Sequence, residues 1–150
     1  MQEYSFKKMS KKNHMGIIDN VDSIKKVLFS VTGSGAAENN IIGIDMENKE
    51  LYYNVNVVTM GNAEPTIYLD DNKIDMIKNM LVYFKVNEWE IFYEDPYNED
   101  IMDGFAWSIT LLSSDLLVEK HIGCGKKRSD VTPPSFSEFE KIMIDLAEGK

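Results

Sequence analysis

The chain has 150 residues, of which 43% are apolar and 27% are charged, and its net charge is −9. This length and composition are typical of one folded globular domain and argue against a disordered or membrane protein. Apolar runs fall far short of the roughly 20 residues that cross a bilayer, and the N-terminal lysines lack the apolar segment of a signal peptide. We therefore expect one domain that makes no membrane contact.

Residues 1–20 are predicted to be a flexible lead-in, because no apolar periodicity is sustained there. Regular structure is expected to begin near Ile24, and residues 21–150 are expected to form the single domain. The first strand follows at once, since Val27, Phe29 and Val31 alternate along one face in the pattern of a half-buried strand.

Two further strands are expected at 41–46 and 50–60, joined by a tight polar turn at 47–49. Because polar and apolar residues alternate along the second strand, the two strands are predicted to form an antiparallel hairpin with one face in water. A short fourth strand is expected at 66–69.

The apolar spacing then changes to that of a helix, which should run from Asp70 to about Lys85, with an aspartate carboxylate as its N-cap. A second hairpin is expected at 106–122, with a Ser-Ser-Asp turn. The chain should end in a helix that starts at Ser135, which has capping-box spacing to Glu138, and that Gly149 terminates. These elements predict an α+β domain: an antiparallel sheet of about five to six strands with two helices packed on one face.

The C-terminal third also carries a recognisable motif. The sequence Asp-Gly-Phe-Ala-Trp-Ser at 103–108 precedes the hairpin, and Pro134 is followed by Phe136 and Phe139. Over roughly residues 22–147 this order resembles a family of small bacterial and phage domains with an Asp-Gly-x-x-Trp-Ser strand and a Pro-x-x-Phe-x-x-Phe helix. The resemblance implies a fold and a bacterial or phage origin, and it implies no activity. The return loop at 123–134 is longer here than in that family.

Cysteine and histidine are scarce in this chain. One cysteine excludes an intramolecular disulfide and favours a reducing cytoplasm. One cysteine and two histidines cannot form a common structural zinc site, and we expect neither a metal nor a cofactor. Cys124 lies between two glycines, three residues after His121. Residues three apart on a strand point to opposite faces, so a turn residue is favoured over a nucleophile paired with a histidine base.

The loop after Cys124 holds a concentrated basic cluster, Lys126, Lys127 and Arg128. Flexible backbone, three cations and the following helix N-terminus could hold an anion, although the spacing is not that of a phosphate loop. The alternative is a solvated turn. An anion-binding protein or an enzyme that uses loop 121–128 is therefore our second hypothesis.

Charge is distributed unevenly along the chain. Residues 1–30 have a net charge of +3, residues 31–118 of −12, and the last 32 residues are balanced. An acidic centre of this size repels nucleic-acid phosphate, so direct nucleic-acid binding is not expected.

The acidic stretch at 88–103 interleaves seven carboxylates with four aromatic residues and contains no basic residue. Aromatic residues anchor protein interfaces, and acids steer a basic partner toward them. The alternative is that Trp89 and Phe92 pack into the core while the acids stay solvated. Our first hypothesis is a non-catalytic cytoplasmic module, similar in role to an immunity or inhibitor protein, that binds a protein partner. Its expected binding residues are Trp89, Glu94, Asp95, Tyr97, Glu99 and Asp100.

Overall fold

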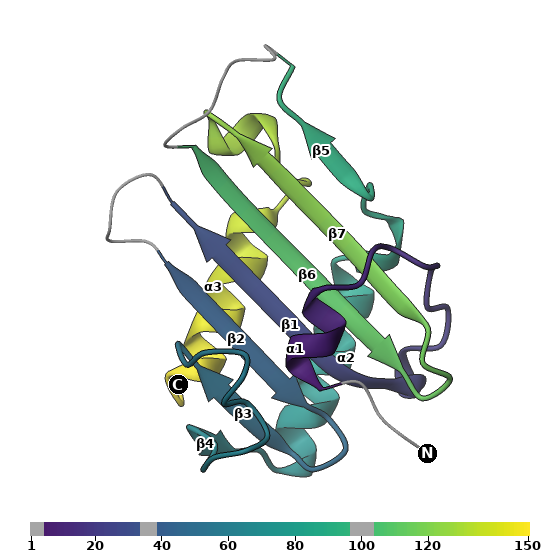
Figure 1. The fold of residues 1–150 in the computed structure, drawn as a ribbon, viewed down its shortest axis with the longest axis vertical. Coiled ribbons are helices and arrows are strands. Elements are labelled where there is room, and N and C mark those ends of the chain that lie inside the picture. Colours follow the sequence, from purple (N-terminus) through teal and green to yellow (C-terminus); the bar gives the residue numbers. More distant parts are fainter. Residues whose placement is uncertain (1–4, 34–38, 97–103) are drawn as a thin grey trace.

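A seven-stranded mixed sheet forms the centre of the computed structural model, which describes residues 5–33, 39–96 and 104–150 (Figure 1). The order across the sheet is β4-β3-β2-β1-β6-β7-β5. The strands are β1 (Ile24–Thr32), β2 (Asn40–Asp45), β3 (Glu50–Tyr53), β4 (Ile67–Tyr68), β5 (Phe92–Glu94), β6 (Phe105–Ser113) and β7 (Val118–Gly125).

The predicted α+β class is confirmed. The sheet has seven strands in place of the five to six predicted, and its pairing is mixed and not purely antiparallel. Both hairpins, β2–β3 and β6–β7, are antiparallel as expected, but the strand predicted at 50–60 ends at Tyr53, where Asn54 turns the chain with a φ of 57°. β5 instead runs parallel to β7, with Phe92 opposite Ile122. Only three residues of β5 pair, which is too few for an alternating pattern to predict a strand. These three residues also contain no feature that would indicate the direction in which the strand runs.

Two helices, α2 (Asp71–Tyr83) and α3 (Phe136–Ala147), pack on one face of the sheet, as predicted (Figure 1). The core lies between them and the sheet, where Phe139 of α3 contacts Phe29 of β1 edge to face, with ring centres 5.5 Å apart. This arrangement buries the alternating side chains of β1 that the sequence marks as inward-facing.

The two helix starts differ from each other. The Asp70 carboxylate accepts a 2.8 Å hydrogen bond from the Lys73 N–H, so the predicted N-cap of α2 is confirmed. The capping box predicted for α3 is wrong, because Ser135 has a φ of 62° and its side chain makes no capping hydrogen bond. The chain enters α3 through a turn in which the Phe136 N–H donates to the Pro133 carbonyl.

A third helix, α1 (Phe6–Ser10), covers the opposite face of the sheet. Its Phe6 and Met9 are buried against Leu28, Tyr52 and Leu112. Regular structure therefore begins at Phe6 and not near Ile24. The hairpin face expected to be in water is also covered, since Tyr52 is almost fully buried.

Residues 11–20, which we call the N-terminal strap, then pass along the part of the β7 edge that does not pair with β5. The Met15 and Gly16 N–H groups both donate to the Val118 carbonyl, and the Ile18 N–H donates to the Glu119 carboxylate at 2.8 Å. The strap thus carries the chain from the face of the sheet that α1 covers to the face that α2 covers. Of the helices in the described ranges, not one combines the length and the apolar character that spanning a bilayer requires.

Candidate functional site

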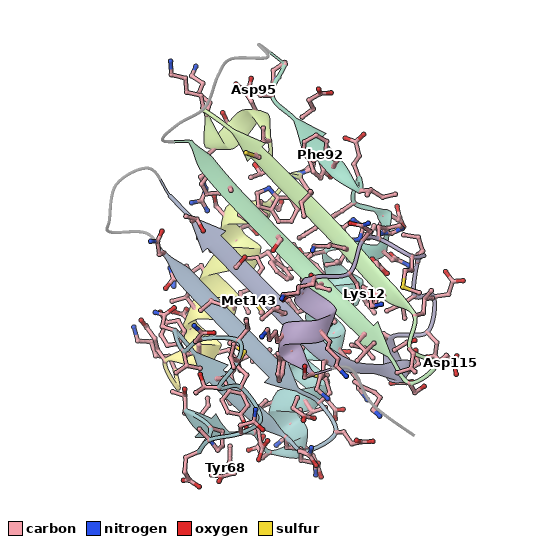
Figure 2. The ribbon with its side chains drawn as sticks, in the orientation of Figure 1. Lys12, Tyr68, Phe92, Asp95, Asp115 and Met143 are labelled. Atoms are coloured by element: carbon pink, nitrogen blue, oxygen red, sulfur yellow. The ribbon has the colours of Figure 1, made fainter. Side chains whose placement is uncertain are left out.

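The acidic stretch reaches the surface along β5, the end strand of the sheet. Ile91 and Phe92 are each about half exposed. Figure 2 shows Phe92 at this edge of the molecule. Glu88, Glu90 and Glu94 are also exposed. We call Glu88, Glu90, Ile91, Phe92 and Glu94 together the β5 edge surface.

Trp89, predicted to be an interface anchor, belongs to the core. It is 7% exposed, and its indole N–H donates to the Phe84 carbonyl at 3.0 Å. Its ring packs edge to face against Trp107 and Phe139. The spacing of an aromatic residue among acids cannot reveal this, because the turn after α2 decides which side chain is directed inward.

The other predicted binding residues divide into three groups. Glu94 is exposed on β5, opposite Cys124 in the register with β7. Asp95 is buried, and its carboxylate accepts a 3.3 Å hydrogen bond from the Lys126 N–H, so it anchors the loop. Tyr97, Glu99 and Asp100 lie outside the described residues. The surface that can be described is therefore centred on β5 and not on the whole 88–103 stretch.

Tyr93 fixes which face of β5 is outward. Its ring lies 5.9 Å from that of Trp107 on the helix-covered side, and its hydroxyl oxygen accepts a hydrogen bond from the Glu90 N–H. Burial raises the pKa of this hydroxyl and the Glu90 carboxylate adds to the rise, while the hydrogen bond from the Glu90 backbone lowers it. Since neighbouring strand residues alternate, Phe92 and Glu94 point away from the helices.

The basic loop is largely engaged within the protein. The Arg128 guanidinium donates to the Glu140 carboxylate and lies over the rings of Phe105, at 4.9 Å, and Phe136, at 5.5 Å. Lys126 and Lys127 are exposed at the surface. Lys127 and Arg128 border a shallow depression whose wall also contains the Glu138 carboxylate. The structure brings these cations together with carboxylates, which compete with any bound anion.

Cys124 and His121 occupy opposite faces of β7, as the sequence predicts. His121 is buried and Cys124 is exposed. The two flanking glycines have a packing role: a Cβ on Gly123 would collide with the Trp107 indole nitrogen and the Val131 carbonyl, and one on Gly125 with the Val131 side chain. The Gly-Cys-Gly sequence therefore belongs to β7 and not to the turn expected from the sequence, and its glycines reflect close packing under the loop.

A polar pair that the sequence analysis missed is buried on the helix side of β7. Glu119 and His121 have side chains that are 0% exposed, and their Oε2 and Nε2 atoms are 2.5 Å apart. His121 Nδ1 lies 2.9 Å from the Glu90 carbonyl. The sequence could have indicated this pair. Residues 119, 121, 123 and 125 lie on the same face of a strand, because every second side chain points to the same side, so Glu119 and His121 are neighbours on that face.

A count of donors and acceptors defines the protonation of this pair. The Glu90 carbonyl can only accept, so Nδ1 carries a hydrogen, and the short Nε2 to Oε2 contact requires a second one between the two atoms. With that proton the pair has no net charge, whichever atom holds it. The Ile18 N–H satisfies the other carboxylate oxygen.

The described residues contain no group of three or more histidine, cysteine, aspartate or glutamate side chains arranged to hold a metal ion. Comparisons of the chain with protein-family models, with curated proteins and with solved structures find no match. The resemblance to a family of bacterial and phage domains therefore stays a prediction.

Proposed function

We propose that the chain is a non-catalytic protein-binding module whose β5 edge surface binds an extended, basic segment of a partner. One observation carries this proposal: β5 is an end strand, and the β5 edge surface, made by this strand and the residues just before it, presents two half-exposed apolar side chains among three carboxylates. End strands with apolar side chains are templates for pairing with another chain.

The mode of binding would be strand addition. The partner's backbone would pair with the free side of β5, where no strand is bonded within the described residues. Its apolar side chain would pack on Phe92, and its lysine or arginine side chains would meet Glu90 and Glu94. Main-chain hydrogen bonds supply affinity in such complexes, and the side chains supply selectivity.

The charge distribution favours a basic partner over an acidic one. The 31–118 segment has a net charge of −12, and complementary fields accelerate encounter and reject like-charged partners. A role similar to that of an immunity protein or inhibitor, in a bacterial or phage cytoplasm and against a nucleic-acid enzyme or toxin, fits this charge.

The second hypothesis, an anion site or enzyme in loop 121–128, has less support. Arg128 is already bound to Glu140, and His121 cannot reach Cys124 from the opposite face. We therefore propose the β5 edge surface as the binding site.

The single cysteine gives a direct test. Cys124 is exposed and in register with Glu94, so a small fluorine-bearing tag on its thiol reports on β5 without any substitution. A peptide that alternates lysine and valine should shift the tag's resonance saturably. The matched peptide that alternates glutamate and valine should not.

Two double variants separate a specific site from general attraction to an acidic protein. Glu90→Lys with Glu94→Lys should weaken the basic peptide at least about tenfold. Glu64→Lys with Asp75→Lys makes the same charge change at exposed positions away from β5 and should have a much smaller effect. Equal weakening in both variants, or binding without a shift at Cys124, would overturn the proposal.

A further inference from the structure

A cavity of about 310 Å³ lies where the N-terminal strap meets the end of α2. Its walls come from two segments far apart in sequence, residues 18–24 and 81–88, and its floor from Leu111 of β6 and Glu119 of β7. At about 30 Å³ for each water molecule, this space equals roughly ten waters. It lies at the lower end of the size range of small-molecule sites.

The interior of this cavity is aliphatic. Seven of its twelve lining residues are isoleucine, leucine or valine, and none is aromatic. Val21 and Val82 are on the accessible part of the wall, whereas Ile18 and Leu111 are buried. Such a surface favours a flexible alkyl group, since a buried CH₂ contributes about 0.8 kcal/mol.

The floor adds no charge preference. Glu119 lines the cavity, but its side chain is closed off from solvent, and both of its oxygens are engaged, by Ile18 and His121. With its shared proton the Glu119–His121 pair is neutral overall. The charge of a ligand is therefore selected at the mouth.

Three ionisable residues surround the mouth: Asp19, Lys85 and Glu88, all exposed. Two carboxylates and one ammonium group give the mouth a negative net charge. The rest of the protein, whose net charge is −9, makes the electrostatic potential there more negative. A cationic head group is favoured there over an anionic one.

We propose that this cavity is a binding site for a short-chain aliphatic ammonium ion, with the alkyl chain between the strap and α2 and the ammonium group between Asp19 and Glu88. The site shares Glu88 with the β5 edge surface, but its aliphatic walls lie outside that surface, and the proposal does not depend on the function proposed for β5.

Three probes of equal chain length test the proposal: octylammonium, octanol and octanoate, each below its aggregation concentration. Amide resonances of isotope-labelled protein should shift saturably with octylammonium, and the shifts should be confined to the cavity walls. Octanoate should bind about fivefold more weakly or worse, and added salt should reduce this difference. Octanoate binding as tight as octylammonium, or shifts spread over the surface, would contradict the proposal.

Two variants test the location. Val21→Phe fills the cavity, and Val82→Trp narrows its mouth from a position that is 59% exposed, so the fold should be retained. Each should weaken octylammonium at least about fivefold, since each occupies the space of the alkyl chain. Val58→Trp, at a 51% exposed position outside the cavity, is the matched control and should bind normally. Undiminished binding in both cavity variants would rule this site out.

Discussion

At the scale of single residues, Glu119 and His121 are the clearest case of mutual dependence. Each would keep one buried polar atom unpaired if the other were absent, and such an atom costs more than the hydrogen bond that it would have made. The pair also holds the strap, since Glu119 accepts from the Ile18 N–H. Its position on β7 links the strap to the core.

Substitutions at Glu119 should separate hydrogen bonding from charge. Glu119→Gln keeps an acceptor for Ile18 and supplies an N–H to His121 Nε2, so it should lower the free energy of unfolding by about 1 kcal/mol or less. Glu119→Ala leaves both partners unsatisfied and should cost about 3–5 kcal/mol. Urea denaturation measures both. Equal losses would show that the charge, and not the hydrogen-bond geometry, is required.

Gly123 is a second residue whose role depends on close approach. The Trp107 indole N–H donates a 2.7 Å hydrogen bond to the Val131 carbonyl directly above it. Only a residue without a Cβ leaves room for this bond, which holds the loop against the sheet.

Gly123→Ala should therefore break the Trp107 to Val131 hydrogen bond and destabilise the fold by about 2–4 kcal/mol. The neighbouring Cys124→Ala changes an exposed side chain and should stay within about 0.5 kcal/mol. Tryptophan fluorescence during denaturant titration follows both. A Gly123→Ala protein as stable as Cys124→Ala would mean that the loop can move away at little cost.

At the scale of elements, most predictions that rest on local pattern hold, although the capping box of α3 and the length of the strand at 50–60 do not. The two hairpins and α2 are found as expected, because alternation, helical spacing, turns and an N-cap each operate within a few residues. α1 was missed because a helix of five residues with two apolar side chains has no periodicity to detect. It exists because the sheet face beneath it is apolar.

Phe6→Ala measures how much α1 contributes to the fold. Phe6 is almost fully buried, and its loss should cost about 3 kcal/mol or more and increase hydrogen exchange in the strap. Lys7→Ala, at the exposed neighbouring position, is the control and should change little. Unaltered stability in Phe6→Ala would instead support the flexible lead-in expected from the sequence.

At the scale of the whole molecule, the basic segments do not merge into one patch. Lys120 lies under the strap, and its ammonium donates to the Ser10 and Lys12 carbonyls, while Lys127 lies beyond the other end of β7. Along a strand, seven residues span about 20 Å, more than twice the screening length at physiological salt. We still expect no direct binding to nucleic acid.

Composition, charge and local periodicity were enough to predict an α+β domain, its hairpins and the acidic character of its centre, because each depends on neighbouring residues. They were not enough to assign surfaces. Trp89 and Asp95 are buried and Phe92 is half exposed because of how β5 docks against β7 and how the loop at 126 folds over it. The cavity likewise requires the strap and α2 to meet, although about sixty residues separate them. Such contacts depend on long-range packing, which a linear pattern does not encode.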